Sequence, residues 1–217
     1  GLCALILRRN GTDIGIGSRF VIYDDADQLS VVKKAMEQAD VDDKRVAPRS
    51  IADAISEAKS KLISFDDYET AASTYFERIV SDVYGNYQKL LSRNDAVDFD
   101  DLLFKTYVLL RDNDSIAAKY RERYVHLMID EFQDTNAAQY AIARQLSSKH
   151  KNICVVGDPD QSIYSWRHAD IRNILSFQRD FPKSKMLALE ENYRSSQNIL
   201  YAAEAVISEN SQRMERK

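Results

Sequence analysis

Glycine, proline and cysteine are scarce in this sequence. Its 217 residues include six glycines, three prolines and two cysteines. Disordered and low-complexity chains are rich in glycine and proline, so this composition excludes them and favours a folded, helix-rich protein. Cys3 and Cys154 lie far apart, and Cys154 falls within an apolar run. This usage excludes a disulfide framework and indicates a reduced protein of the cytoplasm.

Long apolar runs are missing as well. No stretch approaches the roughly 18 to 20 apolar residues that a helix needs to cross a bilayer, so we expect no membrane partner. The chain starts at Gly1 with neither an initiator methionine nor a basic leader. We therefore expect a piece of a longer protein.

An excess of positive charge is also lacking. The 30 Lys and Arg residues are balanced by 34 Asp and Glu residues. A nucleic-acid-binding protein usually shows a basic footprint, so net charge gives no argument for such a partner. Several cations of the first half could meet a DNA duplex, but their pattern favours solvated helix faces. They are Arg49, Lys59, Lys61, Lys89 and Arg93.

Apolar residues spaced by three or four positions predict helices in the first half of the chain. Asp24 precedes one such helix and Ser50 a second. Asp66 opens a third, which we expect to run to Leu90 over about 35 Å. Asp98 starts a fourth helix, with the spacing of a capping box.

From about residue 113 the rhythm changes to short apolar runs that alternate with helical stretches. This alternation is typical of parallel β-α units. The runs cover residues 124–129, 153–156 and 186–189, and the helices near 136–147, near 170–181 and after Ser195 separate or follow them. The sequence therefore predicts an α/β fold with a partial parallel sheet. We expect a helical subdomain over 1–112, part of a sheet domain over 113–194, and a closing helix over 195–217.

The first candidate site follows the run 125–129. Asp130 and Glu131 come directly after this apolar strand, and ligands bind at the carboxyl ends of strands in open α/β sheets. Mg²⁺ bound to nucleotide phosphates takes one or two carboxylates, and a further carboxylate can orient the attacking water. The alternative is that the acidic residues only decorate the next helix, with Asp134 or Thr135 as its cap.

The second candidate site is the segment from Gly157 to Arg167, which again follows an apolar strand. Gln161 could then reach a terminal phosphate at the same sheet edge. If the protein backbone is extended here, Tyr164 and Trp166 project to one face and could stack on unpaired bases. Arg167 would then lie near the backbone of the bound nucleic acid. The alternative for Trp166 is a core plug beside a turn.

The third candidate site lies where the run 186–189 leads into the last helix. Arg194 near a helix N-terminus is unfavourable unless an anion sits there, so it could stabilise charge on a transferring phosphate. Tyr193 could stack on a base. The alternative is an exposed arginine before a serine cap.

Three motifs in this order and spacing resemble the superfamily 1 helicases of the UvrD/PcrA/Rep family. They are DEFQDTN at 130–136, GDPDQSIYSWR at 157–167 and LEENYRS at 189–195. The likeness covers almost the whole chain, because Cys3–Arg9 and VDFDDL at 97–102 also resemble segments of this family.

The resemblance implies a RecA-like first motor domain that uses ATP and Mg²⁺. It implies Asp130 and Glu131 as the metal and catalytic carboxylates, Gln161 and Arg194 as γ-phosphate sensors, and Tyr193 as the adenine stacker. Residues lining the single-strand track would be Tyr164, Trp166 and Arg167. It further implies 3′→5′ movement on single-stranded DNA and unwinding at junctions with duplex, in repair or replication.

The chain departs from the family pattern in what it lacks. No phosphate-binding loop of the form G-x-x-x-x-G-K-[ST] occurs, and Gly11, Gly15 and Gly17 favour a simple turn. Sequence for a second motor domain is missing beyond one helix, so we expect the segment to need the rest of its chain and to be inactive in ATP hydrolysis alone. His168 stands where the family usually has glycine.

Two other functions stay open at this point. The same motor motifs occur in helicase-nucleases, which a downstream nuclease domain would identify. A non-catalytic module that grips single-stranded DNA with its aromatic residues would hydrolyse no nucleotide.

Overall fold

The protein is described by a computed structural model of residues 1–209, whose contacts separate it into two compact units. The helical unit comprises residues 1–127 and 136–154, and the motif unit comprises 128–135 and the chain from 155 onward. Helices, including 3-10 helices, make up 62% of the described residues and the strands form small parallel sheets, which confirms the predicted α/β class. The domain boundary expected at residue 112 refers to a longer protein and stays a prediction.

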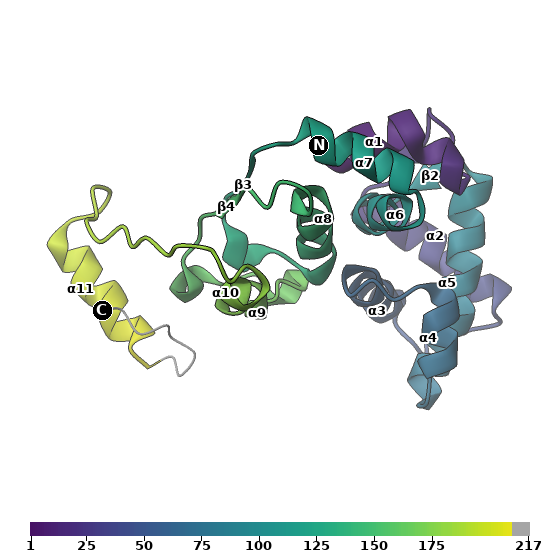
Figure 1. Ribbon diagram of the computed structural model, residues 1–217. Coiled ribbons are helices and arrows are strands. Elements are labelled where there is room, and N and C mark those ends of the chain that lie inside the picture. The colour runs from purple at the N-terminus through teal and green to yellow at the C-terminus, as the bar shows by residue number, and fades with distance from the viewer. Residues whose placement is uncertain (210–217) are drawn as a thin grey trace. The chain divides into compact units, whose positions relative to one another are not determined.

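The helical unit contains most of the regular structure (Figure 1). Its two-stranded sheet is parallel and pairs β1 (Val21–Ile22) with β2 (Ala96–Val97). Its helices are α1 (Leu2–Asn10), α2 (Asp25–Gln38), α3 (Pro48–Ser60), α4 (Phe65–Ala71), α5 (Tyr75–Arg93), α6 (Phe99–Asp112), α7 (Asp114–Arg123) and α8 (Ala137–Ser147), with the 3-10 helix η1 (Gly11–Ile14) after α1.

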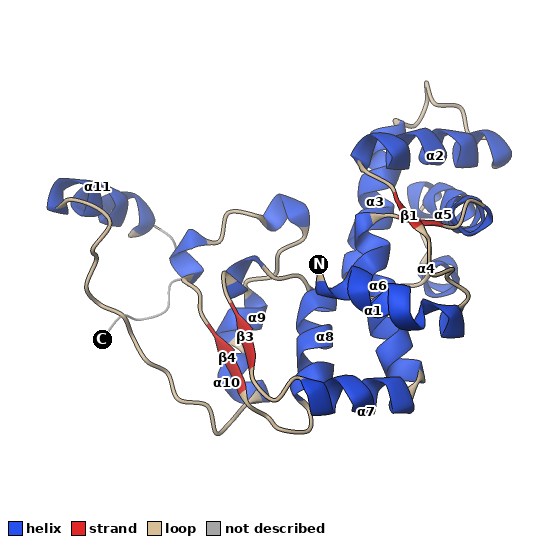
Figure 2. Cartoon of the chain, turned by 90° about the horizontal axis from the view of Figure 1, so that it is seen from above, coloured by secondary structure: helices blue, strands red, loops and turns tan. Residues whose placement is uncertain are grey.

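The second sheet pairs β3 (Leu127–Ile129) with β4 (Ile153–Val155) (Figure 2), and of these strands Leu127, Ile153 and Cys154 belong to the helical unit and the rest to the motif unit. The Leu127 amide donates to the Asn152 carbonyl and the Val156 amide to the Ile129 carbonyl. These bonds advance together along both segments, as in a parallel pair. The other elements are η2 (Phe132–Asp134), η3 (Pro159–Gln161), η4 (Ser165–Arg167), α9 (Arg172–Leu175), α10 (Phe177–Asp180) and α11 (Gln197–Ile207).

Polar caps begin two helices where the sequence predicted them. The Asp24 carboxylate accepts hydrogen bonds from the Ala26 and Asp27 amides at the start of α2, at 2.9 Å each. Asp98 caps α6 by accepting from the Asp101 amide at 2.6 Å. Each cap satisfies backbone donors that have no partner within the helix. The second helix begins at Pro48 rather than after Ser50, because proline suits the first turn of a helix.

The prediction of one long helix from Asp66 to Leu90 is wrong, because the helix is interrupted between the end of α4 at Ala71 and the start of α5 at Tyr75. The Glu77 carboxylate accepts from the Ser73 and Thr74 amides at 2.9 and 2.8 Å, and the Thr74 hydroxyl caps the Glu77 amide. These bonds lower the pKa of Glu77 to about 2. Apolar spacing continues across the break, so periodicity alone concealed this capping box.

Two expectations for the later chain are also wrong. Residues 186–189 form no strand among the described residues, and Leu187 and Leu189 are 86% and 92% exposed. A strand needs a neighbour to satisfy its backbone, and the described residues supply none beside this run. The helix expected over 170–181 is divided at Ser176 into α9 and α10. The closing helix α11 ends at Ile207, and residues 210–217 of that expectation lie outside the described part.

The glycine stretch after α1 forms a turn, as expected. Gly15 closes η1 in the left-handed region with φ 76°, a conformation that glycine adopts without steric cost. Across residues 1–209, none of the helices is both long and apolar enough to span a bilayer.

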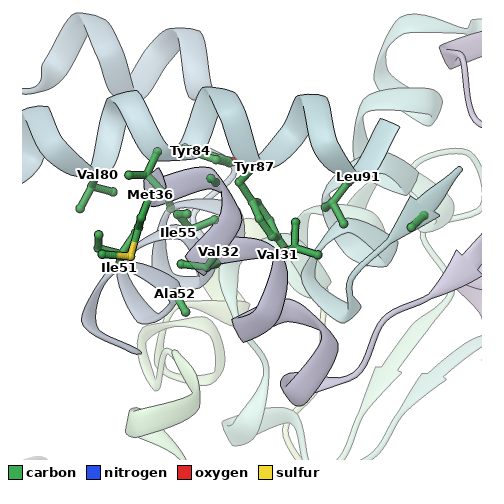
Figure 3. Packing of buried hydrophobic residues seen from close by; sticks show 14 residues of the cluster. Val31, Val32, Met36, Ile51, Ala52, Ile55, Val80, Tyr84, Tyr87 and Leu91 are labelled. Atoms are coloured by element: carbon green, nitrogen blue, oxygen red, sulfur yellow. The ribbon is translucent and has the colours of Figure 1, made fainter. Parts of the chain in front are cut away.

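One hydrophobic core of the helical unit lies between α2, α3 and α5 (Figure 3), and a second lies among α1, α6, α7 and α8. Each helix contributes side chains that are almost fully buried, and burial of each large apolar side chain is worth about 1.5–3 kcal/mol. The central ones are Val32 and Met36 from α2, Ile51 and Ile55 from α3, and Tyr84 and Tyr87 from α5.

A buried charge cluster joins α3, α5 and α6 beside this core. The Lys59 ammonium lies 2.6 Å from an Asp98 oxygen and 2.9 Å from an Asp101 oxygen. The Tyr87 hydroxyl donates to Asp98 at 2.7 Å. Lys59 is only 1% exposed, so its assignment to a solvated helix face is wrong. Burial acts to lower the pKa of Lys59, but Asp101 and Asp98 outweigh it and raise that pKa well above its usual range.

We expect the Lys59→Ala substitution to lower the free energy of unfolding by about 3–5 kcal/mol, because Asp98 and Asp101 would remain buried without their cation. Urea denaturation of the protein would measure the change. Lys61→Ala is the matched control, since Lys61 pairs with Glu57 at an exposed position of the same helix end and should change stability by about 0.5 kcal/mol or less. Equal effects of the two substitutions would contradict the assigned role of Lys59.

A second acidic group near this cluster makes stability depend on pH. Asp100 accepts a 2.5 Å hydrogen bond from the Ser56 hydroxyl. Burial, followed by the charge of Asp98, raises the pKa of Asp100 from 3.8 to about 6. The folded state binds the Asp100 proton more tightly than the unfolded state does, so this proton stabilises the fold. The stabilisation is complete below pH 3.8 and is lost as the pH rises through about 6.

Asp100→Asn should therefore stabilise the protein at pH 8, by about 1–3 kcal/mol, and much less at pH 4.5. Asparagine is neutral at both pH values and can still accept the Ser56 hydrogen bond. Thermal unfolding midpoints of the two proteins across this range would measure the effect. A difference that does not change with pH would show that Asp100 is ionised throughout.

Candidate functional site

The carboxyl ends of β3 and β4 lie at one edge of their sheet, because the two strands are parallel. Asp130 and Glu131 follow β3, and residues 157–161 follow β4, as the sequence predicted. The turn is closed by the Phe132 amide, which donates to the Val156 carbonyl at 2.9 Å. The two polar segments are thereby brought together.

Glu131 occupies a conformation that is unusual for its residue type. Its backbone lies in the left-handed region, with φ 50° and ψ 44°. Its amide donates to an Asp130 carboxylate oxygen at 2.9 Å. A residue other than glycine in this region costs of order 1 kcal/mol or more, and such strain concentrates at functional sites. Both side chains are exposed, so a ligand can reach them.

A chain of hydrogen bonds connects Glu131 with Gln161. The Gln133 amide donates to Glu131 at 2.8 Å, and its oxygen accepts from the Asp158 amide at 3.1 Å. Asp158 in turn accepts from the Gln161 side chain at 3.0 Å. The structure therefore groups two of the predicted site residues through two that sequence reasoning did not single out. The only signal for Gln133 was its place inside the DEFQDTN motif.

The acidic turn does not cap the following helix, which removes one alternative reading. Asn136 caps α8, in a capping box with Gln139. Thr135 instead donates its hydroxyl to the Phe132 carbonyl at 2.7 Å. Asp130, Glu131 and Asp134 are thus free of a capping role.

Asp134 shows how the turn responds to negative charge. Burial, and then the charge of Glu131, raise the pKa of the Asp134 carboxyl, and the Gln133 amide partly offsets them. One Asp134 oxygen is buried and lacks a hydrogen-bond partner among residues 1–209. A further anion beside Glu131 is therefore unfavourable unless a cation or proton accompanies it.

The two carboxylates match a metal that takes most of its ligands from elsewhere. In the part of the chain that the structure describes, no group of three or more His, Cys, Asp or Glu side chains could hold an ion by itself. Mg²⁺ in nucleotide sites is bound by one or two carboxylates, phosphate oxygens and water. The donor set of Asp130 and Glu131 fits that arrangement.

The aromatic residues of the second motif are exposed. Trp166 is 67% exposed and Tyr164 38%, so Trp166 is not a core plug among the described residues. Their ring centroids are 6.1 Å apart, and the Arg167 guanidinium lies 4.6 Å from the Trp166 ring. The backbone turns through η4 instead of running extended, and this turn brings the rings together.

His168 ends η4 in the left-handed region, with φ 63°. This explains why glycine suits the position, since glycine enters that region freely. Histidine is among the residues that tolerate it better than most. The turn that presents Trp166 and Arg167 therefore forms despite the departure from the family pattern.

The third motif is not joined to the other two. Within residues 1–209, no hydrogen bond or ion pair links the Arg194 side chain to Glu131 or Gln161, and Arg194 is exposed. Tyr193 is 88% exposed and donates its hydroxyl to Glu191 at 3.0 Å. The structure thus links Glu131 with Gln161 but not with Arg194, and the binding of a phosphate by these three residues stays a prediction.

Comparison with known proteins places this chain among relatives of known name. The model of the UvrD/REP helicase N-terminal domain family matches residues 1–182. ATP-dependent DNA helicase PcrA of Bacillus subtilis (strain 168) is 46% identical over 212 residues, which cover 98% of this chain and 29% of that protein. The PcrA helicases of Staphylococcus epidermidis (strain RP62A) and Staphylococcus aureus (strain NCTC 8325) show the same identity and coverage.

The chain thus spans less than a third of the length of these relatives, at 29%. The family match nevertheless includes the first two motifs, all of the helical unit and the motif unit as far as residue 182. On this evidence the chain belongs to the UvrD/REP helicase N-terminal domain family.

Proposed function

We propose that the full-length protein carrying this segment is an ATP-dependent DNA helicase. The observation that carries the proposal is the hydrogen-bonded group of Glu131, Gln133, Asp158 and Gln161 at the ends of two parallel strands. The names of the PcrA relatives support it. The phosphate-binding loop and the second motor domain would come from the rest of the protein, so this segment alone would not hydrolyse ATP.

The proposed chemistry is hydrolysis of the γ-phosphate of ATP by water. Asp130 would hold Mg²⁺, with Glu131 as the second carboxylate, and the ion would neutralise charge on the phosphates. Glu131 also accepts a proton from the attacking water and orients it. Gln161 donates its amide to the γ-phosphate. Arg194 stabilises the charge of the transition state, and Tyr193 stacks on the adenine.

The DNA side of the proposal rests on the exposed aromatic turn. Tyr164 and Trp166 are exposed aromatic residues on which unpaired bases would stack. Arg167, whose guanidinium lies 5.6 Å from the Tyr164 ring, would contact the phosphate backbone of the DNA. Gln161 and Tyr164 belong to one short segment of the chain. Loss of the γ-phosphate contact at Gln161 can therefore shift Tyr164 and the base stacked on it. We propose 3′→5′ movement on single-stranded DNA, unwinding at junctions with duplex, and a cytoplasmic role in repair or replication.

Glu131→Gln in the full-length protein should abolish DNA-stimulated ATP hydrolysis while single-strand binding persists. The substitution keeps the shape of the side chain but removes the proton acceptor, whose loss costs about 100-fold or more. Steady-state ATPase rates at saturating single-stranded DNA, with fluorescence anisotropy for binding, would measure both. The matched control is Glu77→Gln, a carboxylate of the helical unit that only caps a helix. Hydrolysis that survives Glu131→Gln would favour a non-catalytic DNA-binding module.

Trp166→Ala in the full-length protein should weaken single-strand binding by about 1–3 kcal/mol, the usual contribution of one stacked base. Trp166→Phe should retain most of that affinity, because a π-face remains. Fluorescence anisotropy titrations with a labelled oligo(dT) would measure the affinity of each variant for single-stranded DNA. Tyr75→Ala is the control, since Tyr75 is a 79% exposed aromatic residue of α5 in the helical unit, outside the motif. An unchanged affinity of Trp166→Ala would remove Trp166 from the DNA track.

A further inference from the structure

Gln133 is a buried polar residue close to two acidic residues that are more accessible to solvent. It is 1% exposed, whereas its neighbours Glu131 and Asp134 are exposed and half-buried. Burying an amide is costly unless its donors and acceptor are satisfied. The Gln133 nitrogen donates to Glu131 at 2.8 Å and more weakly to Asp134 at 3.4 Å, and its oxygen accepts from Asp158. All of its partners belong to the candidate site.

The turn that carries Gln133 is anchored on its other side by contacts that avoid the site. The Phe132 ring packs edge to face against Phe177, with centroids 5.6 Å apart. The Thr135 carbonyl accepts from the Asp170 amide and from the Asn173 side chain, at 2.9 Å each. The 3-10 turn η2 is therefore held independently of Gln133, which leaves this side chain to connect the turn with residues 157–161.

Gly157 shows how closely the two segments approach. A Cβ atom at this position would lie 2.5 Å from the Gln133 side-chain oxygen and 3.1 Å from the Phe132 nitrogen. The second of these atoms belongs to the backbone and cannot rotate away. Glycine is needed at 157 for room, and that room is used by the Gln133 oxygen as it reaches the Asp158 amide.

We infer that Gln133 is a positioning residue that holds the Glu131 carboxylate and the Gln161 loop in one arrangement. This inference rests on the proposed function. Gln133 occupies one oxygen of Glu131 and leaves the other for the attacking water. Through Asp158 it orients Gln161, so the group that orients water and the group that senses the terminal phosphate are set together. Such supporting hydrogen bonds commonly decide whether a site is held tightly enough for catalysis.

The first test compares two buried amides of the motif unit in the full-length protein. Gln133→Ala should lower the kcat of DNA-stimulated ATP hydrolysis by about 10- to 100-fold, with KM for ATP changed by about threefold or less. Asn173→Ala is the matched control, because Asn173 is 7% exposed and, within residues 1–209, its side chain donates only to Thr135. It should lower the thermal midpoint similarly but leave kcat within about threefold of the unaltered protein. Equal kcat values for the two variants would overturn the inference.

The second test uses the pH profile, which a merely structural role would not move. In Gln133→Glu the new carboxyl resembles the amide only when protonated, because only then can it donate to Glu131 and still accept from Asp158. The Glu131 and Asp134 carboxylates that Gln133 contacts, at 2.8 and 3.4 Å, would repel a further negative charge at this position. The kcat of this variant relative to the unaltered protein should therefore rise about tenfold or more as the pH falls from 8.5 to 6. A flat ratio would overturn the inference.

The Glu131→Gln variant separates this inference from the proposed function. If Glu131→Gln retains hydrolysis, the proposed role of Glu131 fails and the role of Gln133 fails with it. If Glu131→Gln is inactive while Gln133→Ala matches Asn173→Ala, the helicase proposal stands and only the positioning role is overturned.

Discussion

The parallel pairing of β3 with β4 is the constraint on which the candidate site depends. Two backbone hydrogen bonds near its end, from Val156 to Ile129 and from Phe132 to Val156, bring the two following loops to one edge. Without that pairing, Glu131 and Gln161 would belong to unrelated turns. Each strand of the pair has only three residues, and so short a ladder of backbone hydrogen bonds is weak by itself. Side-chain hydrogen bonds must therefore help to hold the two loops together.

Those side-chain bonds run through the turn η2, which is apolar on one side and polar on the other. Phe132 packs against Phe177, while Gln133 faces Glu131 and Asp158. Burial of a ring therefore fixes the same turn whose amide orients a carboxylate. The left-handed backbone of Glu131 is sustained by this anchoring, because nothing in glutamate itself favours it.

The helical unit contains a buried cluster of charged residues. Lys59 draws two carboxylates of α6 into the same interior that holds Tyr87 of α5. Buried ion pairs add little net stability compared with apolar packing, but they tolerate few alternative arrangements. We interpret the cluster as fixing the positions of α3, α5 and α6 relative to one another, because a shift of any of these helices would separate Lys59, Tyr87 and the two carboxylates.

The sequence by itself determined the α/β class, the helix starts at Asp24 and Asp98, and the strand ends that carry Glu131 and Gln161. These features follow from local patterns, namely caps, apolar runs and ordered motifs, which need no distant partner. The break before Tyr75 is also local, because the Thr74–Glu77 capping box lies within four residues, but the apolar spacing that continues across it hid it. Only the tertiary structure decided the burial of Lys59, the exposure of Trp166 and the bridging role of Gln133. The burial of Lys59 and the role of Gln133 depend on side chains and backbone groups that meet from elements far apart in the chain, and the exposure of Trp166 depends on what packs around it, none of which the spacing of residues along a sequence specifies.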